Sequence, residues 1–393
     1  MSLFPFRKMV KYLAAITILP TGIALIGGGV SGAQSYAQPS KKLATPPTSS
    51  SFSVTSILTG SSLLHDFSAQ GGIQSGYLSQ PDDLTELGSV LFVAFQNHVG
   101  PQGQPSSSGN TSSTVVEMTL AGKVLANVDI SGHLDGLTAD AAHNRVVATV
   151  NEDANSSIFT ITPSVPVGVR VKQYFYNQAL SHGGGTDAIS IYHGRILVSA
   201  SAPTTSDGPA VFAVTLDPLT SVATVVPVFF DNSQANLANG QTAGSVQLAL
   251  TDPDSNGVVP GTSPRFPGDF VLDSQGDQQQ IYVHDAGGPA QKLSVLNLSQ
   301  AINDTAWVTG SSGVLYVTDH THDTVDAVHG QMTVGTAFVA ATPCDSNNAP
   351  SICPTNEYPA NYLGFLNMNT GIITPVNVSG SALQPAGLQF VTN

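Results

Sequence analysis

Positive charge is scarce in this chain. Lysine and arginine together number 12 in 393 residues, against 26 aspartates and glutamates, and charged residues of both signs make up only 10% of the sequence. Nucleic acids and anionic membranes are recognised by clusters of Lys and Arg, which this sequence does not supply. We therefore expect no nucleic-acid partner and no membrane partner for the folded, processed protein, whereas so acidic a surface is compatible with cations.

Cysteine and the common catalytic signatures are also rare. The two cysteines, Cys344 and Cys353, are too few for a structural zinc site, and in an exported chain they favour a disulfide that closes a short loop. The sequence contains no G-x-S-x-G, Walker, H-E-x-x-H or paired C-x-x-C motif. We therefore expect no nucleotide cofactor.

Only the N-terminus carries a long apolar run. Residues 12–30 are uncharged and follow Arg7, Lys8 and Lys11, and small residues that suit signal peptidase end at Ala33 and at Ala37. The sequence predicts a signal peptide over 1–37, with an uncleaved membrane anchor as the alternative, a disordered linker over 38–53 and one domain over 54–393. The protein is thus expected to be secreted or periplasmic. Removal of the signal leaves nine basic residues against 26 acidic ones, a formal charge of −17.

The most informative feature present is a repeated pair of strands. Each copy begins with an Asp, followed by an apolar strand and then by a second one a few residues later. Five copies begin at Asp82, Asp135, Asp187, Asp269 and Asp304, and a sixth, partial copy has Ala386 at this place. The apolar runs are short, rich in Val, Ile, Thr, Phe and Tyr, and separated by turn residues. A long-period repeat of this kind predicts an all-β, radial fold, the β-propeller.

The spacing of the copies predicts about six blades. The second copy holds four strands, over 137–140, 146–150, 157–162 and 169–176, and four antiparallel strands make one propeller blade. Unequal spacing further on predicts an insertion over 231–267 and a fourth blade trimmed to three strands. Seven blades are the alternative if one degenerate copy escapes the pattern. Because the last copy has a single strand, we expect residues 53–58 to close the ring.

The repeats resemble a known group of proteins. Asp135-Gly136-Leu137 and the strand 315–319 are similar to repeats of the six-bladed propeller superfamily that includes NHL-repeat proteins, SMP-30/gluconolactonase-like lactonases and strictosidine-synthase-like proteins. Residues 315–325 also resemble YVTN-type surface repeats. The resemblance covers most of residues 80–393 and implies a six-bladed propeller. Its lactonase branch implies an axial divalent metal held by Glu, Asn and Asp side chains. Quinone-dependent propellers would repeat Trp in every blade, and with Trp307 alone no quinone cofactor is expected.

The Asp residues that begin the repeats are the strongest functional signal. If each starts the innermost strand of its blade, then Asp82, Asp135, Asp187, Asp269 and Asp304 face one mouth of the central channel. Carboxylates around one cavity repel each other, and a hard cation such as Ca²⁺ would stabilise them. The alternative is that each Asp is a turn residue whose side chain accepts backbone N–H bonds.

Further candidates follow the second strands, whose ends should reach the same mouth. Asn97, Glu152 and Asp285 have the chemistry that the lactonase resemblance implies for a metal site, and they complete the predicted ligand-binding set. His320 and His322 share one side of an extended segment, which suits Zn²⁺ or Cu²⁺ if a third ligand is present. A solvated surface pair is the alternative.

The most specific local motif lies in the expected insertion. The run Asp252-Pro253-Asp254-Ser255-Asn256-Gly257 matches the first half of a Ca²⁺ loop, with oxygen ligands at every second residue and Gly at the turn. The Glu that an EF-hand requires is replaced by Ser263, so another oxygen would have to complete the site. We predict Ca²⁺ ligands at Asp252, Asp254 and Asn256, with an Asx turn as the alternative.

Three functional hypotheses follow from these features. The first is an exported, monomeric binding protein whose acidic channel mouth takes a small-molecule or protein ligand and which Ca²⁺ stabilises. The second is a metal-dependent hydrolase of small esters or lactones in the same channel. The third is a purely structural surface protein.

Overall fold

Strands are the regular elements that build this fold. The computed structural model describes residues 52–393 except 70, 181, 202–206, 241–243 and 344–360. In this part of the chain the helices are four short 3₁₀ segments, namely η1 (Gly60–Ser62), η2 (Ala141–His143), η3 (Val167–Val169) and η4 (His182–Gly184). None of the described helices is long and apolar enough to cross a membrane.

The first three blades follow one another along the chain, each with four antiparallel strands. The first holds β4 (Pro81–Leu87), β5 (Val90–Phe95), β6 (Ser112–Thr119) and β7 (Val124–Ser131). The second holds β8 (Leu134–Asp140), β9 (Arg145–Val150), β10 (Ser157–Ile161) and β11 (Val171–Tyr176). The third holds β12 (Ile189–Tyr192), β13 (Arg195–Ser199), β14 (Pro209–Asp217) and β15 (Val222–Phe230). A short parallel pairing between β11 and β15 joins the second and third blades into one sheet.

The other three blades are less regular. The fourth holds β18 (Pro253–Val258), β19 (Phe270–Ser274), β20 (Gln279–His284) and β21 (Lys292–Asn297), with β16 (Gln234–Leu237) and β17 (Ser245–Gln247) added outside. The fifth holds β22 (Ile302–Trp307), β25 (Ala337–Ala341), β26 (Tyr362–Leu366) and β27 (Ile373–Pro375). The sixth holds β29 (Pro385–Thr392), β23 (Gly313–Asp319), β24 (Thr324–His329) and β1 (Phe52–Thr59), with β28 (Val378–Gly380) at its edge. A separate hairpin is formed by β2 (Leu64–Ala69) and β3 (Gly72–Tyr77).

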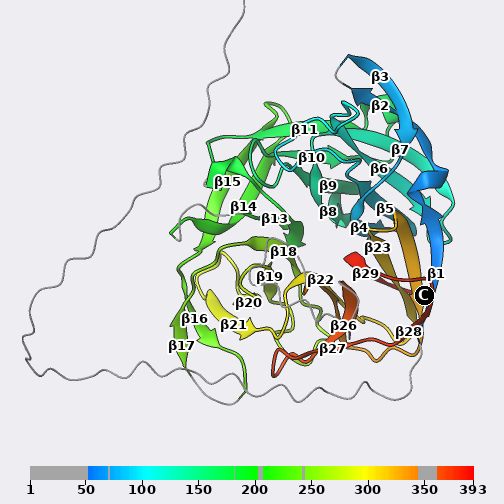
Figure 1. The fold of residues 1–393 in the computed structure, drawn as a ribbon. Coiled ribbons are helices and arrows are strands. Elements are labelled where there is room, and N and C mark those ends of the chain that lie inside the picture. The colour runs from blue at the N-terminus through cyan, green and yellow to red at the C-terminus, as the bar shows by residue number, and fades with distance from the viewer. Residues whose placement is uncertain (1–51, 70, 181, 202–206, 241–243, 344–360) are drawn as a thin grey trace, which may run out of the picture. The chain divides into compact units, whose positions relative to one another are not determined.

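These sheets form a closed ring, so the prediction of a six-bladed β-propeller is confirmed. Each innermost strand contacts the next, in the cyclic order β4, β8, β12, β18, β22, β29 and back to β4. Figure 1 shows β4, β8, β18, β22 and β29 around the centre, with β7, β15 and β17 toward the outside. Within the described residues the ring has six blades, not seven.

The N-terminal strand closes the ring, as the sequence predicts. In the sixth blade β1 pairs antiparallel with β24, from Ser53 opposite His329 to Thr59 opposite Thr324. The C-terminal strand β29 is the innermost strand of the same blade and pairs with β23. The two ends of the described chain are therefore held in one sheet.

Two predicted blades are wrong in their composition. The innermost strand of the fourth blade is β18, from within the expected insertion, so this blade is not trimmed to three strands. The fifth blade is interrupted in sequence: β22 pairs with β25, while the intervening β23 and β24 belong to the sixth blade. Asp304 and the strand after it are thus in different blades.

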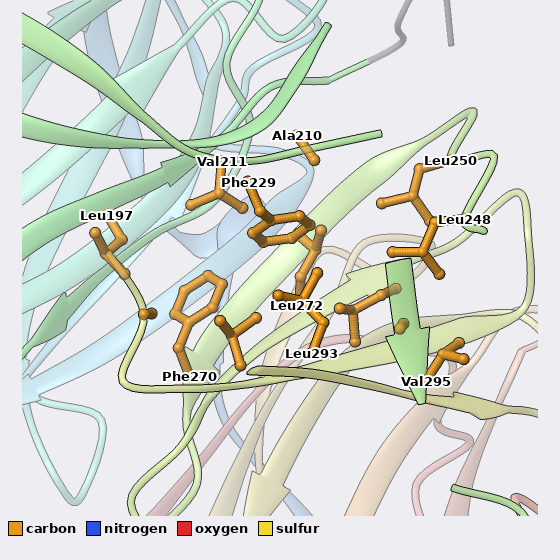
Figure 2. Packing of buried hydrophobic residues seen from close by; sticks show 14 of the residues in the cluster. Leu197, Ala210, Val211, Phe229, Leu248, Leu250, Phe270, Leu272, Leu293 and Val295 are labelled. Atoms are coloured by element: carbon orange, nitrogen blue, oxygen red, sulfur yellow. The ribbon is translucent and has the colours of Figure 1, made fainter. Parts of the chain in front are cut away.

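Apolar side chains fill the spaces between neighbouring blades. One cluster joins Leu197, Val211 and Phe229 of the third blade to Phe270 and Leu272 of the fourth, and all five are nearly or completely buried. Figure 2 shows these side chains between the two sheets. Such packing fixes the innermost strands, and with them the side chains that face the axis.

Several predictions concern residues outside this description. The predicted signal peptide over 1–37, Cys344 and Cys353 lie outside the described residues. The predicted linker over 38–53 does too, except for its last two residues, Phe52 and Ser53, which begin β1.

Candidate functional site

The register of the innermost strands brings one residue of each blade to an equivalent place near the axis. In five blades one residue of the innermost strand lies opposite the middle of the second strand, as Leu137 lies opposite Ala148. The residue two positions earlier in the chain lies at the start of the innermost strand, at the same mouth of the channel in each of these blades. The fifth blade is aligned with the first because Asp304 makes the same kind of hydrogen bond to the following blade as Asp83 does. These six equivalent residues, which we call the axial layer, are Asp82, Asp135, Asp187, Asp254, Asn303 and Ala386.

Two members of the predicted Asp ring, Asp269 and Asp304, and the predicted ligand Asp285 therefore lie outside the axial layer. Asp269 precedes β19, whose first residue lies opposite Val258 at the far end of β18, so Asp269 is at the opposite mouth, where it contacts His284 Nδ1 at 2.9 Å. Asp285 follows β20 at that same opposite mouth, and its Oδ2 accepts the N–H of Ala290 at 2.8 Å. Asp304 lies one residue beyond the axial layer, although it still lines the cavity.

Five of the six axial-layer residues, all but Ala386, line a cavity of about 790 Å³. Its lining includes Gln96, Asn256 and three histidines, His98, His133 and His320, but no Lys or Arg among the described residues. Eight carboxyl groups line it, from Asp82, Asp83, Asp135, Glu152, Asp187, Asp252, Asp254 and Asp304. The sequence predicts a cluster of acidic side chains at one channel mouth. Such a cluster is present, although a partly different set of residues forms it.

Burial raises the pKa of these carboxyl groups. It raises the pKa of Asp82 to about 6 and that of Asp304 to about 7. For Asp135, Asp187 and Asp254, burial acts first and neighbouring carboxylates add to it, so each pKa lies well above its usual range. At neutral pH the cavity therefore either retains protons on several carboxyls or binds cations in their place.

The sharpest cluster in the cavity joins His133, Asp135 and Glu152. His133 Nε2 lies 3.0 Å from Asp135 Oδ1 and 3.9 Å from Glu152 Oε1. The other ring nitrogen, Nδ1, donates to the carbonyl oxygen of Val99, so Nε2 of the neutral ring presents its lone pair to the carboxylate. Because both atoms are acceptors, a proton or a metal ion must lie between them, and the proton can be carried by the Asp135 carboxyl, whose pKa burial raises.

Asp135 itself is incompletely satisfied. It is only 7% exposed, and its Oδ1 also accepts from Gln96 Nε2 at 3.3 Å. The backbone N–H of Glu152 approaches the carboxylate and acts to lower its pKa, but Oδ2 makes no hydrogen bond within 3.5 Å among the described residues. A buried carboxylate oxygen without a donor is costly unless a proton or a cation compensates it. His133 was missed by the sequence analysis, although its place two residues before Asp135, immediately ahead of β8, was a usable signal.

The remaining predicted ligands have mixed positions. Asn97 does not line the cavity, because its Oδ1 accepts the N–H of Ser79 at 3.1 Å and its Nδ2 donates to Thr114 Oγ1 at 3.0 Å. His320 is largely buried in the cavity wall with an unpartnered Nε2, whereas His322 Nδ1 contacts Asp319 Oδ2 at 2.8 Å. The two imidazoles therefore have different surroundings, with His320 in the cavity lining and His322 on Asp319.

The Ca²⁺-like motif forms a strand rather than a loop. Asp254 and Asn256 belong to β18, and both line the cavity together with Asp252 just before it. Asn256 Nδ2 donates to the Ala188 carbonyl oxygen at 2.8 Å, which ties the fourth blade to the third. Asp254 hydrogen-bonds with Asp187, so this motif contributes carboxylates to the axial cavity instead of wrapping an ion by itself.

Comparisons with known proteins assign no family to this chain. No family model and no curated protein matches it. Solved structures with similar folds include the periplasmic gluconolactonase PpgL of Pseudomonas aeruginosa, with 12% identity, a TM-score of 0.45, and coverage of 86% of this chain and 99% of that one. The β-propeller domain of Cps50 (Swd1) from Myceliophteria thermophila has 11% identity, a TM-score of 0.42, and coverage of 84% of this chain and 90% of that one. A functionally unknown protein from Desulfotomaculum acetoxidans has 9% identity, a TM-score of 0.44, and coverage of 87% of this chain and 99% of that one. Likenesses at this level carry no argument about what the chain binds or does.

Proposed function

We propose that this protein is a binding protein that holds a divalent metal ion in its axial cavity, with His133, Asp135 and Glu152 as the protein ligands. The observation that carries the proposal is the buried Asp135 carboxylate, which faces a histidine Nε2 at 3.0 Å and has a second oxygen without a partner. Two ligand atoms 3.0 Å apart can bind one ion at the usual metal–ligand distances of about 2.1 Å.

The donor set favours one class of metal over another. Imidazole nitrogen combined with carboxylate oxygen suits Zn²⁺ and related transition metals, whereas Ca²⁺ prefers oxygen ligands alone. The hydrogen bond from His133 Nδ1 to Val99 supports this assignment, because a backbone acceptor of this kind orients metal-binding histidines in many proteins. Zn²⁺ therefore replaces the Ca²⁺ of the sequence analysis as the first ion to test.

Calorimetric titration of the metal-free protein with Zn²⁺, and separately with Ca²⁺, tests the proposal. We expect one Zn²⁺ per chain, bound more tightly than Ca²⁺, and at least tenfold weaker binding by Asp135→Asn and Glu152→Gln. Asp269→Asn is the matched control, since that carboxylate lies at the opposite mouth. The proposal is overturned if Zn²⁺ binds without fixed stoichiometry, or equally well to the Asp135 and control variants.

The same preparation separates binding from hydrolysis. A metal-loaded protein that hydrolyses a generic lactone, and loses this activity with a chelator, is the hydrolase of the second hypothesis. A protein that binds Zn²⁺ without turnover is the binding protein proposed here.

A further inference from the structure

The cavity changes character along its length. Four residues after the axial layer, five innermost strands place apolar side chains, which we call the collar: Ala139, Ile191, Val258, Trp307 and Phe390. All five line the cavity, and the corresponding residue of the first blade is Glu86. A β-bulge interrupts the pairing at the axial layer in five of the six innermost strands, so the four residues cover roughly 10–13 Å, and one end of the cavity is carboxyl-lined and the other largely apolar.

The charge of the cavity lining determines which ligand head groups can bind. Eight carboxyl groups and no Lys or Arg among the described residues face the cavity. A single divalent ion balances only two of these groups, and a cationic head can replace a proton that another carboxyl retains, whereas an anionic head finds no positive partner in the lining.

One acidic group shows where such a head would bind. Asp135 is 7% exposed, and its Oδ2 has no hydrogen-bond partner among the described residues. Its Oδ1 already faces His133 Nε2. A donor from a ligand at Oδ2 would satisfy this atom without displacing the histidine contact.

We propose that the ligand of the axial cavity is an amphiphilic amine. Its ammonium group lies in the axial layer, donating to Asp135 Oδ2, and its apolar body extends to the collar at Trp307 and Phe390. A volume of about 790 Å³ suits a ligand of this size, since small-molecule sites measure roughly 300–1,000 Å³. The inference rests on the proposed function, because the same cavity must be the binding site and the metal ion must occupy the His133 side of Asp135.

The test compares three probes that separate the head from the body. n-Decylamine has both features, butylamine lacks the long chain, and decanoate has the chain with an anionic head. Each is titrated, below its micelle concentration, into Zn²⁺-loaded protein by calorimetry and by fluorescence. Trp307 is the only tryptophan in the chain, so its emission reports occupancy of the collar directly. We expect decylamine to bind at least tenfold more tightly than either other probe and to shift this emission.

Two substitutions locate the binding. Val258→Thr keeps the shape of the side chain while adding a hydroxyl to the collar, and should weaken decylamine several-fold with no change in Zn²⁺ affinity. Val226→Thr, on the exposed outer strand β15, is the matched control. Asp135→Asn should weaken both decylamine and Zn²⁺.

The outcomes separate this inference from the function on which it rests. Equal binding of decanoate, no dependence on chain length, or an unchanged affinity of Val258→Thr overturns the amphiphilic amine while stoichiometric Zn²⁺ binding leaves the proposed function standing. Failure of Zn²⁺ to bind overturns the proposed function, whichever probe binds.

Discussion

Asp83 and Asp304 make the same pair of hydrogen bonds in the first and fifth blades. In each, Oδ1 accepts the N–H of the next residue at 2.6 Å. Oδ2 of Asp83 accepts the N–H of Leu137, and Oδ2 of Asp304 accepts that of Leu388, both at 2.6 Å. Because Leu137 and Leu388 lie on the innermost strand of the following blade, each carboxylate joins two blades beside the axis.

Removal of one such carboxylate should weaken the ring. We expect Asp304→Ala to lower the free energy of unfolding by about 1–3 kcal/mol, because two backbone N–H groups lose their acceptor. Equilibrium urea unfolding at pH 6 measures this loss of stability. Burial raises the pKa of Asp304 to about 7, so at pH 6 the carboxyl is mostly protonated and the cost of burying its charge contributes little. Asp207→Ala, at an exposed position, is the control. Equal stability of the two variants would contradict the bracing role.

Closure of the ring depends on the N-terminal strand. Phe52 is 1% exposed, and its ring packs edge-on against Phe338 and Phe365 at centroid distances of 5.8 and 5.9 Å. We expect Phe52→Ala to cost about 3–5 kcal/mol, since it leaves a cavity between β1 of the sixth blade and the aromatic rings of the fifth. Urea unfolding measures the loss, with Leu219→Ala, at a 93% exposed side chain, as the control. A loss no larger than that of the control would show that β1 is not needed for closure.

The pH dependence of stability should carry the signature of a buried acid. Asp273 is 2% exposed and accepts from Ser255 Oγ at 2.8 Å, and burial raises its pKa from 3.8 to about 6. Between these two values the native state holds a proton that the unfolded state has released. Stability from this group is therefore complete below about pH 4 and is lost as the pH rises toward 6, by roughly 3 kcal/mol.

The variant Asp273→Asn removes this titration. We expect its unfolding free energy to fall less steeply than that of the wild type between pH 4 and pH 7. The control variant, Asp217→Asn, should show the opposite pH dependence. A hydrogen bond from Thr220 lowers the pKa of the exposed Asp217, so ionised Asp217 stabilises the native state. Asp217→Asn should therefore be less stable than the wild type only at pH values above those at which Asp217 ionises. Parallel stability profiles for wild type and Asp273→Asn would exclude the assigned role.

The sequence predicts the regular part of this fold well. In the second blade every strand lies within a few residues of its predicted place, because the apolar runs alternate clearly with turns. Asp82, Asp135, Asp187 and Ala386 occupy the equivalent places that the repeat implies. Regular spacing aligns the first three of these, and the strand pattern around Ala386 aligns the last copy.

The errors arise where pairing is decided by distant contacts. The innermost strand β18 has the sequence PDSNGV, which has almost no apolar pattern, so the apolar β19 after Asp269 took its place in the prediction. The interleaving of the fifth and sixth blades depends on β23 finding β29 near the C-terminus, which no local signal shows. The metal-binding proposal likewise needs Val99 beside His133, a contact across 34 residues.

Anomalous X-ray diffraction from crystals of the protein soaked in Zn²⁺ tests the central claim most directly. The account requires a peak at the zinc absorption edge within bonding distance of His133 Nε2 and of one oxygen of Asp135, and no such peak in crystals of Asp135→Asn. A peak elsewhere in the cavity, or none at these residues in the wild type, would contradict the assignment and leave a hydrogen bond, with one shared proton, between His133 and Asp135.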